Sequence, residues 1–117
     1  MSTRINFLYR DASNYKHPGS ITIGDDLTDE QRATIAATLN DGQFFIPEQV
    51  GFPNPRDQFE KLSEDDHCWC ELEPAYAFED DESQPTDSRS AAEVVAAFVD
   101  AVAEGWDDVS YAPTVSA

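Results

Sequence analysis

The sequence predicts an α+β domain: a small, mostly antiparallel sheet of about three strands, two main helices and short helical turns begun by prolines. Two observations lead to this prediction. Apolar and polar residues alternate in separate segments, which is typical of strands with one buried face. Two other segments begin with capping-box residues and continue with apolar residues at helical spacing. At 117 residues the chain is expected to form one domain, 1–117.

Two N-terminal segments are predicted to pair as a hairpin. Residues 4–10 alternate apolar and polar side chains, and residues 20–23 repeat the pattern. Turn-forming residues fill 11–19 between them, ending in Pro18-Gly19, and predict a long loop. The side chains expected to face inward from the two strands are Ile5, Phe7, Tyr9, Ile21 and Ile23.

The first helix is predicted to begin after Thr28. Thr28 and Gln31 form a capping box, in which a hydroxyl and an amide satisfy free backbone N–H groups. Gly42 is expected to take the left-handed conformation that ends a helix. The expected buried stripe is Ile35, Ala36 and Leu39.

Prolines break up residues 43–62. We expect an extended piece at 43–46, a helical turn from Pro47 to Gly51, and a short helix at 55–62 capped by Asn54. The apolar residues of this segment, expected to fill the core rather than line a partner groove, are Phe44, Phe45, Ile46, Val50 and Phe52.

Residues 68–78 are predicted to form the central strand, with acidic runs on both sides. Pro74 interrupts the strand, which predicts a bulge there or a position at the sheet edge. By alternation Glu71 and Glu73 face outward. The residues expected to face inward are Cys68, Cys70, Leu72, Tyr76 and Phe78.

The last helix is predicted at about 90–104, with Ser90 and Glu93 as its capping box and Gly105 at its end. A polar acidic loop, 79–89, precedes it and is expected to be loose. The tail 106–117, also expected to be loose, carries Trp106, Val109 and Tyr111, which can dock back onto the domain. The residues expected to be buried in the helix are Val94, Val95, Phe98, Ala101 and Val102.

Charge is the unusual property of the chain. The net charge is −17, from 7 basic and 24 acidic residues. Residues 1–61 carry six bases and nine acids, whereas residues 62–117 carry fifteen acids and one base, Arg89. The second half should repel nucleic acid and anionic membranes and attract basic partners. No apolar run is long enough for a signal peptide or membrane span, so we expect a cytoplasmic protein.

The acidic runs supply the main candidate site, a surface that binds a basic protein. Trp69 is its expected aromatic anchor, because interface hot spots favour tryptophan. A secondary candidate is the first loop with its aromatic and basic residues: Tyr9, Arg10, Asn14, Tyr15 and Lys16. The residues expected to bind the partner are Glu64, Asp65, Asp66, Trp69, Glu71, Glu73, Glu79, Asp80, Asp81 and Glu82.

A metal site or a catalytic cysteine is the natural alternative at His67-Cys68-Trp69-Cys70. A structural zinc site needs four ligands, and neighbouring residues of a strand face opposite ways. Acidic surroundings would also raise the pKa of a thiol rather than activate it. We therefore expect free, buried thiols, no metal, no cofactor and no catalytic residue.

Three segments resemble a group of small bacterial and mobile-element proteins that has no assigned activity. They are YRDASNYK at 9–16, FFIPEQVG at 44–51 and DDHCWCELE at 65–73. Cys70 stands where the pattern of that group has a histidine, so no role is carried over for that position. The small size and acidity are similar, more loosely, to phage inhibitors of restriction and CRISPR systems.

Two functions follow from the acidity. The first is a non-enzymatic binding protein that mimics DNA and inhibits a nucleic-acid-binding defence or DNA-processing protein, without binding nucleic acid or membrane itself. The second is a small housekeeping or ligand-binding protein of a salt-adapted cell, whose acid serves solubility. The oligomeric state does not follow from the sequence.

Overall fold

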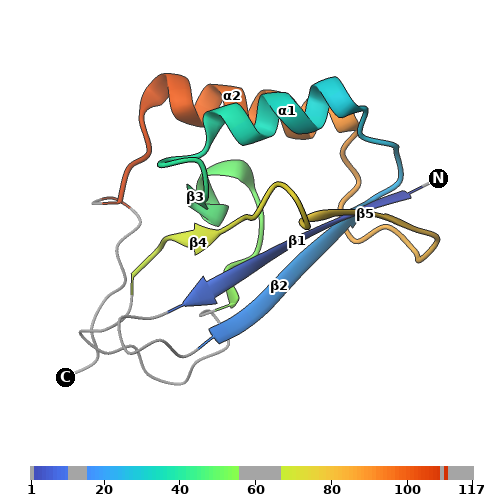
Figure 1. The fold of residues 1–117 in the computed structure, drawn as a ribbon, viewed down its shortest axis with the longest axis horizontal. Helices are drawn as coiled ribbons and strands as arrows, with labels where there is room; N and C mark the ends of the chain where they lie inside the picture. Colours follow the sequence, from blue (N-terminus) through green and yellow to red (C-terminus); the bar gives the residue numbers. More distant parts are fainter. Residues whose placement is uncertain (1, 11–15, 56–66, 109, 111–117) are drawn as a thin grey trace.

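Two helices lie side by side over one face of a five-stranded sheet in the computed structural model (Figure 1). The structure describes residues 2–10, 16–55, 67–108 and 110. Strands pair in the order β2-β1-β4-β3, and β5 also pairs with β1. All strand pairings are antiparallel, so the predicted α+β class is confirmed. Within the described ranges no helix is both long and apolar enough to cross a membrane.

The centre of the sheet is β1 (Ser2–Arg10), rather than the segment 68–78 predicted for that place. One edge of β1 pairs along its length with β2 (Lys16–Ile23). The other edge pairs with β4 (Cys70–Glu71) and β5 (Phe78–Asp81), and β3 (Phe44–Phe45) lies outside β4.

The predicted strand 68–78 is two short strands separated by a turn. Between the pairs Leu8↔Glu71 and Ile5↔Phe78, β1 has two residues and its partner has six, 72–77. The partner therefore has four more residues than β1 in this stretch, and they form an outward turn. In this turn the amides of Tyr76 and Ala77 donate to the carbonyl of Glu73. Pro74 has no N–H for a continuous ladder, which accounts for the break.

The four extra residues are an even number, so Cys70 and Phe78 still face the same side of the sheet as Tyr9 and Ile5, their partners. The alternation read from the sequence therefore holds for both strands. It fails for Tyr76, which lies in the turn and is 81% exposed instead of buried.

The hairpin prediction is confirmed, but its second strand starts earlier than expected. β2 begins at Lys16, so Pro18-Gly19 lie in the strand opposite Leu8 and Phe7 rather than in a turn. An edge strand tolerates Pro18 because an outward N–H is not needed. Gly19 permits a close approach, since a Cβ there would lie 2.7 Å from the Phe7 ring.

Both predicted helices form, and both capping boxes are present. Helix α1 (Asp29–Thr38) and helix α2 (Ala91–Glu104) begin at the same end of the molecule (Figure 1). Gly42 has the expected positive φ of 75°, but it lies in the turn before β3, because α1 has already ended at Thr38. Val102 is 43% exposed, so its predicted burial is wrong.

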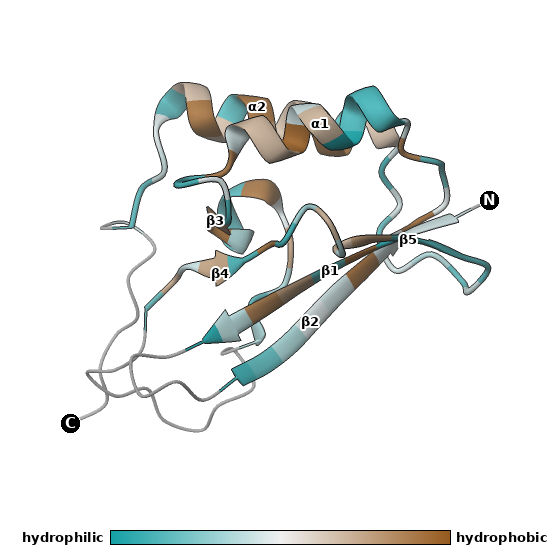
Figure 2. Cartoon of the chain, viewed as in Figure 1, coloured by the Kyte–Doolittle hydropathy of each residue, from teal (hydrophilic) through white to brown (hydrophobic). Residues whose placement is uncertain are grey.

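An aromatic cluster joins α2 to the sheet. Phe98 packs against Phe45 and Phe52, with both pairs of ring centroids 5.6 Å apart, and Phe7 stacks on Phe52. The turn η1 (Pro47–Val50) begins at Pro47 and ends at left-handed Gly51, as predicted. Figure 2 shows brown, hydrophobic stretches on β1 and α2, the elements that carry Phe7 and Phe98 of the buried core. The prediction that residues 44–52 fill the core is thereby confirmed for all but half-buried Phe44.

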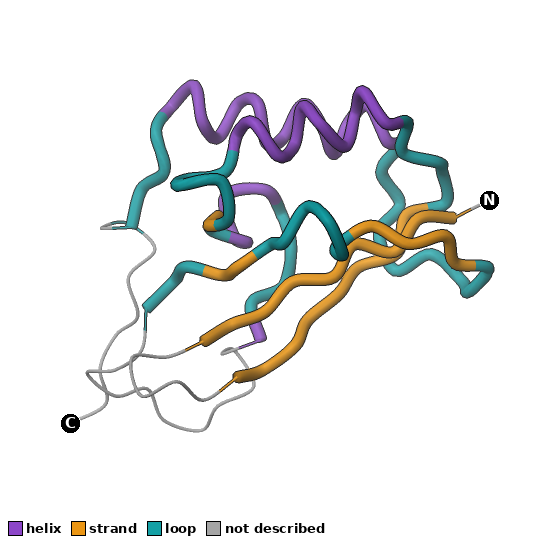
Figure 3. Tube along the Cα trace, in the orientation of Figure 1, coloured by secondary structure: helices purple, strands orange, loops and turns teal. Residues whose placement is uncertain are grey.

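The segment 79–89 is not the loose loop expected from its composition. Its first residues belong to β5, and the amides of Thr86 and Asp87 donate to the carbonyl of Thr22 on β2. Figure 3 shows this path from strand to loop to the start of α2. In the tail, Trp106 docks as expected, and its indole N–H donates to the carbonyl of Thr38 at 3.0 Å. The predicted helix 55–62 and the residues Val109 and Tyr111 lie outside the described residues, apart from Pro55.

Candidate protein-interaction surface

Nine carboxylates gather where both helices begin and β5 runs along β1, a region that we call the acidic end. Thr3 of β1 pairs with Asp80 and donates its hydroxyl to the carbonyl of Asp25, which ties the strand to the loop before α1. The Asp25 carboxylate accepts the amide of Ala91 at the start of α2. Figure 2 shows this end as hydrophilic. The acidic end consists of Asp25, Asp26, Asp29, Glu30, Glu79, Asp80, Asp81, Glu82 and Glu93.

The acidic end keeps most of its negative charge. Among the described residues, Arg4 and Arg32 lie beside it, and Arg32 is 3.8 Å from Asp80. Arg89 also lies near Glu93, but its charge is balanced by Asp87, which is not one of the nine. Each helix N-terminus adds about half a positive charge, or about one in total. Nine carboxylates against two guanidinium groups and this dipole charge leave an excess of about six negative charges. Hydrogen bonds from Ser83 lower the pKa of Asp81 below its ordinary value of 3.8, so Asp81 keeps its charge to a lower pH than a free aspartate does.

Of the other predicted partner-binding residues, those that the structure describes lie away from this end. Glu71 is half-buried and pairs with Arg10 at 2.9 Å, so its charge is neutralised within the molecule. Glu73 is exposed at the outward turn between β4 and β5. Residues 64–66 lie outside the described residues. Of the two predicted acidic runs, the structure therefore describes only the second, 79–82, which belongs to the acidic end.

Trp69 lines a pocket beside β3, next to the turn that follows α1. Phe45 points toward α2, and its neighbour Phe44 points the other way, opposite Glu71. Two adjoining hollows of about 280 and 330 Å³ share the side chains of Phe44, His67 and Trp69. The first hollow is completed by Asn40 and Asp41, and the second by Arg10, Gln43 and Glu71.

His67 fixes the position of the Trp69 backbone. The Trp69 amide donates to Nδ1 of His67 at 3.0 Å, and Nε2 lies 2.6 Å from the carbonyl of Arg10. In this arrangement Nδ1 accepts the Trp69 amide, and Nε2 is placed to donate to the Arg10 carbonyl. The ring also packs on Tyr9, with centroids 5.1 Å apart. His67 is thus a structural element of the pocket wall.

The secondary loop candidate is only partly available for binding. Tyr9 is fully buried, and its hydroxyl accepts the amide of His67, so its side chain is not exposed for recognition as the prediction requires. Alternation explains this, because Tyr9 shares the inward face of β1 with Ile5 and Phe7. Arg10 is half-buried beside Glu71 and Lys16 is exposed, whereas Asn14 and Tyr15 lie outside the described residues.

Both cysteines are buried, as expected. The Cys68 thiol lies 3.9 Å from the carbonyl of Asp108, and the Cys70 thiol lies 3.9 Å from the side-chain oxygen of Asn54. Asn54 is itself 2% exposed and donates to Glu48 and to the carbonyl of Cys68. No three metal-ligating side chains come together within the described part of the chain.

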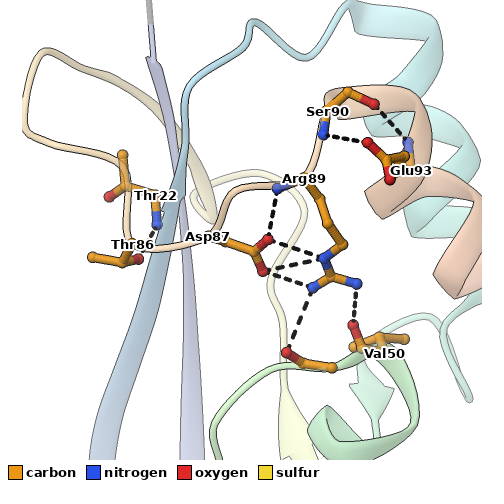
Figure 4. A network of polar contacts seen from close by, with 8 residues as sticks. Thr22, Val50, Thr86, Asp87, Arg89, Ser90 and Glu93 are labelled. Atoms are coloured by element: carbon orange, nitrogen blue, oxygen red, sulfur yellow. Dashed lines mark hydrogen bonds and ion pairs between the residues drawn. The ribbon is translucent and has the colours of Figure 1, made fainter.

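Arg89, the single base of the second half, joins the segment before α2 to residues 50–52, a role that was not predicted from the sequence. Its guanidinium group faces the Asp87 carboxylate and the carbonyl of Val50 (Figure 4). The guanidinium nitrogens donate to the Asp87 oxygens at 2.7 to 3.2 Å and to the Val50 carbonyl at 2.7 Å. The guanidinium group also lies 5.6 Å from the centre of the Phe52 ring. The lone base in an acidic stretch was the available signal, but the backbone carbonyls that it contacts, those of Val50 and Gly51, lie 39 and 38 residues away.

The Asp87–Arg89 pair makes stability depend on pH in a defined direction. The Arg89 hydrogen bonds lower the pKa of Asp87 below its ordinary value of 3.8, against the opposing effect of burial. A lowered folded-state pKa contributes stability above the unfolded pKa, and that stability is lost as pH falls through the folded pKa. We expect wild type to exceed Asp87→Asn in unfolding free energy at pH 6, by an amount that shrinks from about pH 4 toward pH 2.

Urea titrations of both proteins at each pH measure this difference. Both proteins share the other carboxylates, so the effect of their titration on the unfolding free energy cancels when the value for Asp87→Asn is subtracted from that for wild type. A difference that stays constant from pH 6 to pH 2 would show that Asp87 is not stabilised by its charge.

The chain was compared with family models, curated proteins and solved structures, and none of them matches it. The resemblance to mobile-element proteins therefore remains an expectation based on three short segments.

Proposed function

We propose that this protein is a non-enzymatic binding protein whose acidic end engages a basic surface of another protein. The single observation behind the proposal is the excess of about six negative charges on one end of a compact fold. Such a field attracts a basic surface over a distance and speeds association. The proposal places the protein in the cytoplasm, together with such partners.

A nucleic-acid-binding protein is the class of partner that the charge favours. Duplex DNA carries one charge per about 1.7 Å of its axis, and proteins that bind it present basic channels. An anionic protein surface that enters such a channel competes with DNA. We therefore propose a DNA-mimic inhibitor of a defence or DNA-processing protein, the class represented by restriction and CRISPR inhibitors.

Affinity capture tests this proposal. The immobilised protein is incubated with a lysate of cells that carry defence systems and washed with stepwise increasing salt. We expect a basic, nucleic-acid-binding protein that elutes with salt and is displaced by duplex DNA, because both ligands compete for one site. A captured protein that is acidic, or that DNA does not displace, would contradict the mimic.

A folding measurement distinguishes the proposed binding protein from the salt-adapted alternative. A protein whose acidic residues serve hydration in a salty cytoplasm needs salt to fold, whereas a protein whose acidic residues serve binding does not. The proposed function therefore expects a cooperative unfolding transition in dilute buffer. Unfolding below roughly molar KCl would favour the salt-adapted protein, whose charge density is relieved only by screening.

A further inference from the structure

We propose that the pocket formed by Phe44, His67 and Trp69 binds the guanidinium group of an arginine side chain from the basic partner. This inference rests on the proposed function, because it names the group by which that partner is anchored. The pocket lies outside the acidic end, so the partner would be held at two separate places.

The pocket walls suit a flat cation. Phe44 and Trp69 are half-buried aromatic side chains that line both hollows. Trp106 supports Trp69 edge-on, with ring centroids 6.3 Å apart, and the His67 ring fixes its backbone. A guanidinium group stacks on such rings and is only weakly hydrated, so it loses little on entering.

The charges around the pocket favour a cation in the hollow next to Asp41. The described residues that line this hollow are Asn40, Asp41, Phe44, His67 and Trp69; they include one carboxylate and neither an arginine nor a lysine. In the adjoining hollow, Arg10 is neutralised by Glu71 at 2.9 Å. An anionic ligand would meet Asp41 and the overall charge of −17, whereas a guanidinium group can donate to the Asp41 carboxylate.

Asp41 is held in position before any ligand arrives. It has a φ of 53°, in the left-handed region that few residues other than glycine and asparagine adopt readily. The turn is closed on both sides, since Asn40 and Phe44 exchange backbone hydrogen bonds of 2.8 and 2.9 Å. A carboxylate on a closed turn needs little ordering upon binding.

The size of the pocket limits the ligand to one side chain. At about 280 Å³ the hollow beside Asp41 lies at the lower end of ligand pockets, which begin at about 300 Å³. It is open to solvent, so an arginine can enter from a docked protein surface.

Spectra of the ¹⁵N-labelled full chain test the inference. We expect N-acetyl-arginine amide to shift the Trp69 indole signal, and N-acetyl-citrulline amide, which has the same shape without the charge, to leave it unshifted. Asp41→Asn should weaken binding about threefold, because asparagine keeps the left-handed turn but removes the charge. Trp69→Leu should weaken it about fivefold, measured through the backbone amide signals of Asp41 and Phe44, because this variant has no Trp69 indole. Asp100→Asn, an exposed change on α2, is the matched control and should bind as wild type does.

Equal binding of the arginine and citrulline amides would overturn the inference, as would unchanged arginine binding by Asp41→Asn. The two proposals fail separately. A basic partner that elutes with salt, without an arginine-specific shift at Trp69, overturns the pocket alone. An arginine-specific shift without any basic partner overturns the proposed function alone.

Discussion

Replacement of Phe98 by alanine is expected to lower the free energy of unfolding by about 4 kcal/mol. Phe98 is fully buried and touches the rings of Phe45 and Phe52, so its removal leaves a cavity that the surrounding strands cannot close. The loss also loosens the packing of α2 on β3, the strand that carries Phe44. Urea denaturation followed by circular dichroism measures the change.

Val102→Ala on the same helix is the matched control. The sequence predicts burial for both residues, but Val102 is 43% exposed, so its truncation should cost less than about 0.5 kcal/mol. Similar losses for the two variants would contradict the observed orientation of α2.

Replacement of Arg89 by methionine is expected to cost about 2–3 kcal/mol. The change leaves the Asp87 carboxylate without its charge partner and the carbonyl of Val50 without its donor. The Arg89 and Asp87 side chains are 25% and 13% exposed, so the expected loss lies between the values for surface and buried pairs. Urea denaturation at pH 7 provides the measurement.

Arg4→Met makes the same change of charge at an exposed position of β1 and should stay within about 0.5 kcal/mol of wild type. If Arg89→Met were as stable as Arg4→Met, the Arg89 contacts seen in Figure 4 would contribute nothing. Arg89→Lys should recover part of the loss, because an ammonium group cannot form both contacts of the planar fork.

Local signals in the sequence predicted the parts of the fold that depend on neighbouring residues. The capping boxes at Thr28 and Ser90 join residues three apart, and both formed as expected. The turn after Pro47 is equally local, because proline fixes its own φ and Gly51 accepts a positive one. The inward face of β1 followed from alternation alone.

The remaining features depend on residues that are far apart in the chain. The outward turn at 72–77 follows from the pairing of β4 and β5 with the same strand, β1, which the local sequence does not reveal. Arg89 takes its role from Val50, and the pocket joins the turn at Asp41 to Trp69. The acidic end likewise combines residues of α1, α2 and β5, whereas the sequence pattern predicted a binding surface formed by the two acidic runs on either side of residues 68–78.

The claim that the acidic end binds a basic partner is tested most directly by two variants with the same net charge. One carries Glu79→Gln, Asp80→Asn and Glu82→Gln at the acidic end. Asp81 is left intact because it accepts the amide of Ser83. The control variant changes three exposed acids elsewhere: Asp100→Asn, Glu104→Gln and Asp108→Asn.

Binding of both variants to the captured partner is measured by calorimetry over a range of salt concentrations. The account predicts that the acidic-end variant binds roughly tenfold more weakly than wild type at low salt, with a flatter salt dependence. The control variant should stay within about twofold of wild type, because its charges lie outside the interface. An equal loss of affinity in both variants, or no loss in either, would contradict a localised binding surface. The acidity would then be a general property of the chain.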